Sequence, residues 1–188
     1  MSSVDNAKIH DDAFERYRAY LHLLARTHLG DALRKKVDAS DVVQQTLMQA
    51  YRDRDGFRGN SDEELAGWLK QILRNRLIEM ARYWKGQKRD MQRDVELERK
   101  IADSFSRVDE WLVASQTSPS MRAHENDMLF KLPHAIEKLP DDLREAVVLH
   151  HLQGKKLGEI AEQLNCDRTT VGRRLMRGLE QLRRLMEK

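Results

Sequence analysis

The chain has 188 residues, of which 35% are charged, 40% hydrophobic and 6% aromatic, and 34 Lys and Arg against 31 Asp and Glu leave a formal net charge of +3. This length suits one ordinary domain or two small ones, and the abundance of good helix formers such as Leu, Arg, Glu and Ala predicts an all-α fold. No apolar run is long enough to span a membrane, and residues 1–12 lack the apolar stretch of a secretory signal. The single Cys166 excludes a disulfide framework and a Cys-rich zinc site. We therefore expect a cytoplasmic protein without membrane insertion.

Amphipathic helices are predicted in the first part of the chain. Between residues 14 and 25, apolar side chains recur at three- and four-residue steps, as on one face of a helix. Asp38 or Ser40 is suited to cap the next helix, because a short polar side chain accepts a hydrogen bond from a free backbone N–H group. Asp41 would lie in its first turn, where the helix dipole favours a carboxylate, and Leu47 would face the core.

A loop and a long basic helix are predicted next. Residues 53–60 contain two glycines and are expected to form the loop. Ser61 and Glu64 have the spacing of a capping box, in which each side chain binds the backbone N–H group of the other residue. Apolar residues between 65 and 80 trace one helical stripe, so we expect this helix to have a core face and a basic face.

Residues 90–118 interrupt the regular pattern. They hold seven acidic and four basic residues, and their apolar residues follow only a loose helical spacing. We interpret this segment as a linker that contains a transient or docked helix.

A compact helical unit is predicted after the linker. Ser118 and Pro119 would start it, with Ser as the cap and Pro at the first helical position. We expect Pro133, Pro140 and Gly154 to punctuate it. The predicted division is two small helical domains, residues 10–88 and 119–188, joined by an acidic linker, residues 89–118.

The region from Leu157 to Val171 has the spacing of a helix-turn-helix motif. A short helix would end at Leu164, Asn165 is suited to the left-handed turn conformation, and Asp167 is suited to cap a second helix. The outer face of that second helix would present residue types that bind bases or phosphates, namely Arg168, Thr169, Thr170, Arg173, Arg174 and Arg177. An ordinary helical hairpin with a solvated basic face is the alternative.

Two glycines within this second helix call for an explanation. Gly172 and Gly178 each cost about 1 kcal/mol relative to Ala in a helix interior. A close approach of another helix or of backbone would account for them.

Basic residues are concentrated in two blocks. Residues 70–89 carry seven Lys and Arg against one Glu, and residues 168–188 carry seven against two Glu. Mixed, solvated helix faces are the usual explanation of one such block. Two blocks at the ends of two helical units favour a polyanion that is bound at two points.

Four segments, in this order and at these separations, carry a specific pattern. They are Asp41–Leu47 (DVVQQTL), Trp68–Arg76 (WLKQILRNR), Leu139–Arg144 (LPDDLR) and Thr170–Leu175 (TVGRRL). Each is weak alone, but together they resemble the RNA polymerase sigma factors of the extracytoplasmic-function (ECF) group, over roughly residues 12–86 and 118–186.

The resemblance implies a transcription initiation factor that binds core RNA polymerase and directs it to specific promoters. In the family, the Asp-x-Val-Gln helix binds the clamp helices of the polymerase's largest subunit, and the flap is a second expected contact. The residues implied in polymerase binding are Asp41, Gln44, Gln45 and Leu47. A solvated helix is the alternative, and an anti-sigma factor is a further partner that the resemblance leaves open.

The resemblance also implies two DNA sites. In the family, the loop and helix after the polymerase-binding helix read the minus-ten promoter element and help to melt it, and the helix-turn-helix reads the minus-thirty-five element. The residues implied at the minus-ten element are Arg58, Asn60, Lys70, Arg74, Asn75, Arg76 and Arg82. Phe57 and Trp68 could add stacking surfaces, although Trp68 is better placed to pack in the core. The residues implied at the minus-thirty-five element are the six on the outer face of the second motif helix.

Enzyme chemistry is not predicted. His150 and His151 are adjacent and would face different directions, and His124 lacks the second His of a zinc-protease helix. We expect no catalytic residue, no metal and no cofactor. A freestanding helix-turn-helix regulator that binds duplex DNA is the main alternative, and a helical adaptor without a DNA role is the third.

Overall fold

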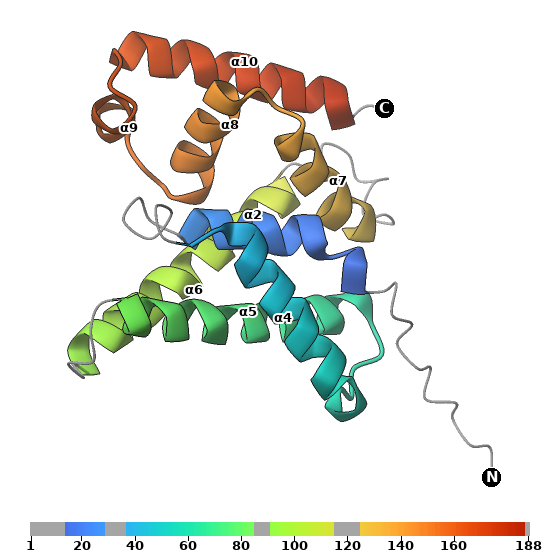
Figure 1. Ribbon diagram of the computed structural model, residues 1–188. Helices are drawn as coiled ribbons and strands as arrows, with labels where there is room; N and C mark the ends of the chain where they lie inside the picture. Colours follow the sequence, from blue (N-terminus) through green and yellow to red (C-terminus); the bar gives the residue numbers. More distant parts are fainter. Residues whose placement is uncertain (1–13, 29–36, 85–90, 115–124, 187–188) are drawn as a thin grey trace.

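The structure is a computed structural model, and it describes residues 14–28, 37–84, 91–114 and 125–186. These residues form helices joined by short turns, with no strand among them, which confirms the all-α prediction (Figure 1). In chain order the elements are α2 (Arg18–His28), α4 (Ala39–Asp53), the 3₁₀ turn η1 (Arg54–Gly56), α5 (Asp62–Trp84), α6 (Met91–Ala114), α7 (Glu125–Glu137), α8 (Asp141–Val147), the π-helical turn η3 (Val148–Leu152), α9 (Leu157–Gln163) and α10 (Arg168–Met186).

The N-terminal domain consists of α2, α4 and α5, which pack on one another. Tyr20, Leu69 and Leu73 are at most 1% exposed in its core, as the helical spacing predicts. Asp38 caps α4, because its side chain accepts a hydrogen bond from the Ser40 N–H group at 2.9 Å. This confirms one of the two predicted caps.

The predicted loop and capping box are mostly confirmed. Asp53 is the last residue of α4, and residues 54–60 contain the single turn η1 and otherwise irregular backbone. At the start of α5, the Ser61 hydroxyl accepts a hydrogen bond from the Glu64 N–H group at 3.2 Å. The Glu64 carboxylate, however, accepts from the N–H group of Asn60 at 2.7 Å, one residue earlier than predicted. The half of the box that depends on Glu64 is therefore shifted by one residue.

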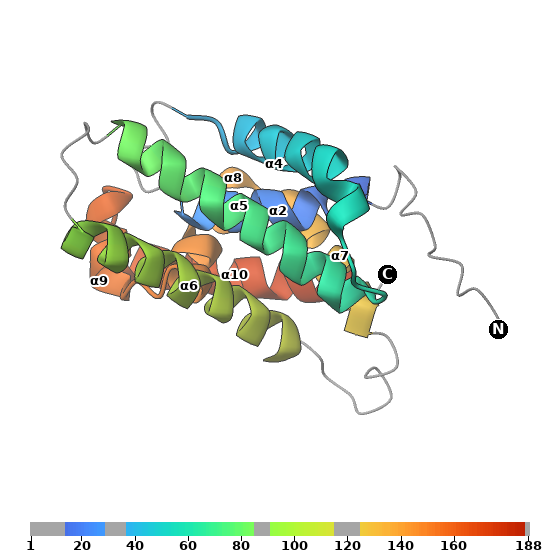
Figure 2. The ribbon, with the colours of Figure 1, turned by 90° about the horizontal axis from the view of Figure 1, so that it is seen from below.

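The acidic linker contains a 24-residue helix, α6, which is docked on the rest of the chain. Ile101, Phe105 and Val108 are at most 8% exposed and belong to the continuous hydrophobic core. Seen from below, α5 and α6 run beside each other, with α4 on the other side of α5 (Figure 2). Of the two options kept open for this segment, the structure has the docked helix.

The C-terminal domain consists of α7 to α10, above the N-terminal domain in Figure 1. Pro140 precedes α8 and Gly154 (φ +68°) follows η3, so both end elements as expected. Pro133 does not, because it lies inside α7, which continues to Glu137. A helix can continue past proline at the cost of one backbone hydrogen bond. The predicted start at Ser118 and Pro119 and the predicted boundaries near residues 10, 88 and 118 lie outside the described residues.

The two domains pack directly on each other. The Tyr17 ring of the N-terminal domain meets the Phe130 ring of α7 edge to face, with centroids 5.1 Å apart, and the Arg16 guanidinium lies 4.6 Å from the same ring's centroid. His22 of α2 lies 3.3 Å from the Glu137 carboxylate. The two domains are thus joined by buried apolar side chains such as Tyr17 and by charged groups such as Arg16 and Glu137 that stay exposed at the edge of the contact.

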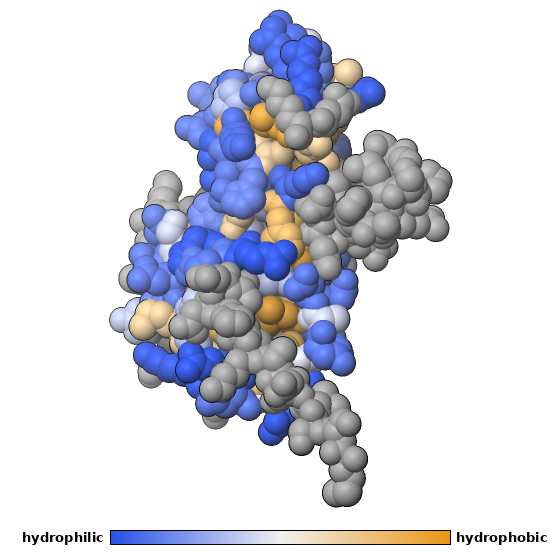
Figure 3. Space-filling model, turned by 90° about the vertical axis from the view of Figure 1, so that its right-hand side faces the viewer, coloured by the Kyte–Doolittle hydropathy of each residue, from blue (hydrophilic) through white to orange (hydrophobic). Residues whose placement is uncertain are grey.

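The face in Figure 3 is largely hydrophilic, and apolar residues show in small patches between charged ones. None of the described helices combines the length and apolarity that crossing a membrane requires.

Candidate nucleic-acid and partner interfaces

The turn between α9 and α10 has the geometry that the sequence predicts. Asn165 has φ +47°, the left-handed conformation, and is the only described non-glycine residue with a positive φ. The Cys166 N–H group donates to the Ala161 carbonyl oxygen at 3.0 Å, and the Asn165 N–H group donates to that of Glu162 at 3.3 Å. This pair of bonds is a Schellman motif, which satisfies two carbonyl groups at the end of α9. The helix-turn-helix prediction is confirmed in its backbone.

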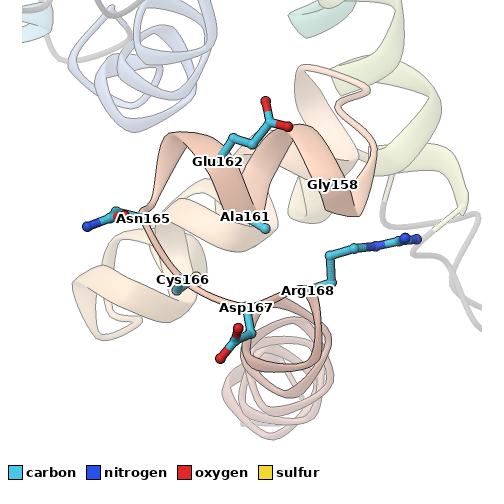
Figure 4. Close-up of a pocket in the computed structure, with 7 residues that line it drawn as sticks. All are labelled: Gly158, Ala161, Glu162, Asn165, Cys166, Asp167 and Arg168. Atoms are coloured by element: carbon cyan, nitrogen blue, oxygen red, sulfur yellow. The ribbon is translucent and has the colours of Figure 1, made fainter.

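A shallow pocket lies at this turn (Figure 4). Its lining includes the small residues Gly158, Ala161 and Cys166. The side chains of Glu162, Asn165, Asp167 and Arg168 spread outward from it in different directions. Two carboxylates against one guanidinium make this hollow unfavourable for a phosphate group. Nucleic acid is expected on the outer face of α10 instead.

That outer face presents most of the predicted contact residues. Arg168, Thr169, Arg173 and Arg177 are exposed, and Thr170 is half-buried. The Arg173 guanidinium lies 3.5 Å from the Thr170 hydroxyl oxygen, so these two side chains are neighbours. An exposed set of Arg and Thr side chains on one helix is able to reach base edges and phosphates in a major groove.

Arg174 is separated from this set. Its Nε atom lies 3.3 Å from the Asp142 carboxylate of α8, and its Nη1 atom lies 3.9 Å from the Cys166 sulfur. The Arg174 side chain therefore joins α10 to α8 and to the turn in the free chain. Sequence reasoning missed Asp142 as its partner, because the two residues are distant in the chain.

Gly178 sets how closely α10 lies against α8. A Cβ atom at this position would come within 2.7 Å of the Val147 Cγ2 atom and 3.5 Å of the Leu143 carbonyl oxygen. This is the close helix approach that the glycine requires, so that prediction is confirmed for Gly178. A Cβ atom at Gly172 would meet nothing within 4 Å, and packing does not explain that glycine.

The predicted polymerase-binding residues divide into exposed and buried ones. Asp41, Gln44 and Gln45 are exposed on α4. Leu47 is only 2% exposed and belongs to the core, so the prediction that it faces a partner is wrong. Helical periodicity indicated the core, and the side chain follows its position on the buried face of α4.

A groove between α4 and α5 adjoins these exposed residues. It is lined by Val37, Asp41, Gln45, Arg76, Glu79, Met80 and Tyr83. Tyr83 is 77% exposed, which is unusual for a large aromatic side chain and suits a protein contact. Sequence reasoning missed Tyr83, although it lies seven residues, about two helical turns, after Arg76 and so on the same side of α5.

Arg76 lines this groove, apart from the other basic residues of α5 that are predicted at the minus-ten element. Its guanidinium donates to the Gln49 side-chain oxygen of α4 at 3.1 Å and lies 2.9 Å from the Glu79 carboxylate. The structure thus brings Arg76 together with predicted polymerase-binding residues, away from Lys70 and Arg74.

Three other basic residues of α5 face α6. Lys70 lies 2.7 Å from the Asp109 carboxylate, and the Glu98 carboxylate lies 3.4 Å from Arg74 and 3.9 Å from Arg82. The Asp109 carboxylate also accepts a hydrogen bond from the Tyr20 hydroxyl at 2.9 Å. Burial and this carboxylate together raise the pKa of Tyr20, so the tyrosine keeps its proton and remains a donor.

The remaining predicted minus-ten residues are accessible. Arg58 and Asn60 are exposed in the loop before α5, and Asn75 is exposed on α5, where its side chain accepts a hydrogen bond from Gln71 at 3.2 Å. Phe57 and Trp68 instead pack on each other, with ring centroids 5.1 Å apart, against the core. Their stacking faces are thus engaged within the protein.

One half-buried histidine, His28, lies where α2 meets α6. Burial, and secondly the charge of Arg107, lower the pKa of His28 to about 4. Its ring meets Phe105 edge to face at 4.8 Å, and its Nε2 atom has no hydrogen-bond partner among the described residues. Within the same residues, no cluster of His, Cys, Asp and Glu has the makings of a metal site.

Comparison with known proteins places both halves of the chain in one kind of protein. Residues 13–89 match the family model described as Sigma-70 region 2, and residues 129–182 match the one described as Sigma-70, region 4. The ECF RNA polymerase sigma-E factors of Salmonella typhimurium and Escherichia coli are each 31% identical to the chain over 148 residues, which is 76% of this chain and 71% of theirs.

A mycobacterial protein is also similar. The ECF RNA polymerase sigma factor SigE of Mycolicibacterium smegmatis is 28% identical over 151 residues. The aligned region covers 80% of this chain but 52% of that relative, so the chain spans about half of its length.

Proposed function

The chain belongs to the ECF family of RNA polymerase sigma factors, and from this we infer that it is a transcription initiation factor that binds core RNA polymerase and directs it to specific promoters. Catalysis of RNA synthesis then belongs to the polymerase, and the chain supplies recognition. Its work would take place in the cytoplasm, where the polymerase and the chromosome are. We propose the division of labour predicted from the sequence, with residues 10–88 and 119–188 as working domains and residues 89–118 between them.

The observation that carries this proposal is the exposed basic face of α10 behind a well-formed turn. We propose that this face reads the minus-thirty-five element. Arg173 and Arg177, with Arg168 and the two threonines, are accessible to a major groove. Arg174 would contribute directly only after it leaves Asp142, and in the free chain it positions α10.

We propose that the polymerase binds the exposed face of α4 and the adjoining groove. Asp41, Gln44 and Gln45 would make polar contacts to the clamp helices of the largest subunit, and Tyr83 would add apolar area. The flap is the proposed second contact, through the C-terminal domain. An anti-sigma factor is a further proposed partner, and it would compete for these surfaces.

We propose that the minus-ten strand binds α5 and the loop before it. Arg58, Asn60 and Asn75 are accessible for first contact. Lys70, Arg74 and Arg82 would hold the separated strand through its phosphates, which is the main source of affinity for single strands. Arg76 would support the polymerase-binding groove instead.

Run-off transcription with purified core polymerase tests the proposal. We expect the full chain to stimulate promoter-specific transcripts from genomic templates, with no transcript from core alone. The proposed function fails if the chain does not stimulate promoter-specific transcription. Tight binding of the chain alone to duplex DNA would then support a freestanding helix-turn-helix regulator.

A further inference from the structure

We propose that helix α6 is an internal competitor for nucleic acid, which covers the strand-binding side of α5 in the free chain and must leave it before the minus-ten strand can bind. This inference rests on the proposed function of α5. The acidic side chains of α6 stand where the phosphates of the strand would stand.

The charge pairing across the two helices supports this role. Three cations of α5 face two carboxylates of α6, with Lys70 on Asp109 and both Arg74 and Arg82 on Glu98. Lys70 and Arg74 keep only 26% and 31% of their side-chain surface exposed. A cation that already holds a carboxylate gains little from a phosphate, because the carboxylate must first be displaced.

Apolar contacts hold the competitor in place. Ile101, Phe105 and Val108 anchor α6 in the core, and Tyr20 fixes the Asp109 carboxylate with a hydrogen bond. The charge pairs therefore act on a docked helix rather than on a mobile tether. In Figure 2 α6 lies next to α5, and Figure 1 shows that the two helices cross at an angle.

The same helix also contacts the C-terminal domain. The Trp111 ring stacks on His151 with an interplanar angle of 7° and centroids 5.2 Å apart, and Arg107 donates from Nε to the Leu152 carbonyl oxygen at 3.0 Å. Separation of the two domains would therefore pull on α6. A polymerase that holds the domains apart would release the cations of α5 in the same step.

Strand affinity of the free chain tests this proposal. A fluorescent oligo(dT) strand at low salt serves as the probe, and its anisotropy gives the dissociation constant. We expect Glu98→Gln with Asp109→Asn to bind the strand about three- to tenfold more tightly than wild type, from the loss of partly exposed ion pairs.

A matched variant separates this effect from simple charge. Asp103→Asn with Glu110→Gln makes the same change in net charge on exposed positions of the same helix. The affinity of this control variant for the strand should rise less than twofold. Adding Lys70→Gln and Arg74→Gln to the Glu98→Gln, Asp109→Asn variant should remove the rise in affinity of that variant. Equal gains in the two charge-matched variants would overturn the proposal.

Hydrogen exchange provides a readout that needs no substitution. The amides of residues 98–110 should be protected in the free chain and lose protection when core polymerase is added. Unchanged protection in the complex would also overturn the proposal. If the chain stimulates promoter-specific transcription while these tests fail, only the competitor role of α6 is lost. If transcription is not stimulated at all, the proposed function itself fails.

Discussion

Replacing Gly178 by alanine tests how α10 is seated on α8. The added methyl group would lie 2.7 Å from the Val147 Cγ2 atom, on a buried and β-branched side chain that cannot easily turn away. Overpacking of this kind costs about 1–3 kcal/mol, whereas the change from Gly to Ala within a helix returns about 1 kcal/mol. We therefore expect a net loss of up to about 2 kcal/mol in the free energy of unfolding.

Gly172→Ala is the matched control. It makes the same chemical change six residues earlier in the same helix, where a Cβ atom meets nothing within 4 Å. It should stabilise the chain by about 1 kcal/mol. Urea unfolding followed by circular dichroism gives both values, and their difference isolates the packing cost. If Gly178→Ala proves as stable as Gly172→Ala, the close approach of α8 does not explain this glycine.

Three further predictions concern α10, α4 and the half-buried His28. Arg173→Ala should weaken binding to a minus-thirty-five element by about 1–3 kcal/mol in an electrophoretic assay with the polymerase complex, and unchanged promoter affinity would contradict a base contact. Asp41→Ala with Gln44→Ala should weaken binding to core polymerase. It should change the free energy of unfolding by less than about 1 kcal/mol, the size of the helix-dipole contribution of a first-turn carboxylate, whereas Leu47→Ala should cost about 2–5 kcal/mol. The assignment fails if the α4 surface variant binds core normally. The folded-state pKa of His28 is about 4, below its unfolded value near 6.5. The contribution of the neutral His28 ring to the free energy of unfolding should therefore be complete above pH 6.5. It should fall at lower pH, as the unfolded chain takes up a proton, by about 2 kcal/mol between pH 7.5 and pH 5. His28→Leu should flatten this slope, and an unchanged slope would assign it to other groups.

Features that depend on neighbouring residues were predictable from the sequence. Asp38 caps α4 and Asn165 adopts the left-handed turn because each outcome follows from local hydrogen bonding and backbone sterics. Gly178 was recognisable as a position that needs a close neighbour, although the sequence did not identify Val147 as that neighbour. The helix-turn-helix followed from several such local signals in register.

Side-chain partners that are distant in the chain were not predictable. The partners Lys70 and Asp109 are 39 residues apart, and Arg174 turns to Asp142 on another helix. Arg76 lies in the same basic block as Arg74 but on a different side of α5, so counting charges along the chain grouped two separate faces. For Leu47, helical periodicity indicated the core and the family resemblance indicated a partner contact, and periodicity was correct.

The apolar stripe of α6 limits what can happen to the helix after it undocks. Ile101, Phe105 and Val108 would then meet water, which costs free energy in proportion to the newly wetted area. Without that packing the released segment should unfold, which is the loss of amide protection expected in the complex. In solution this is unfavourable, so a chain without its polymerase should spend little time open, and its affinity for stray single strands should stay low.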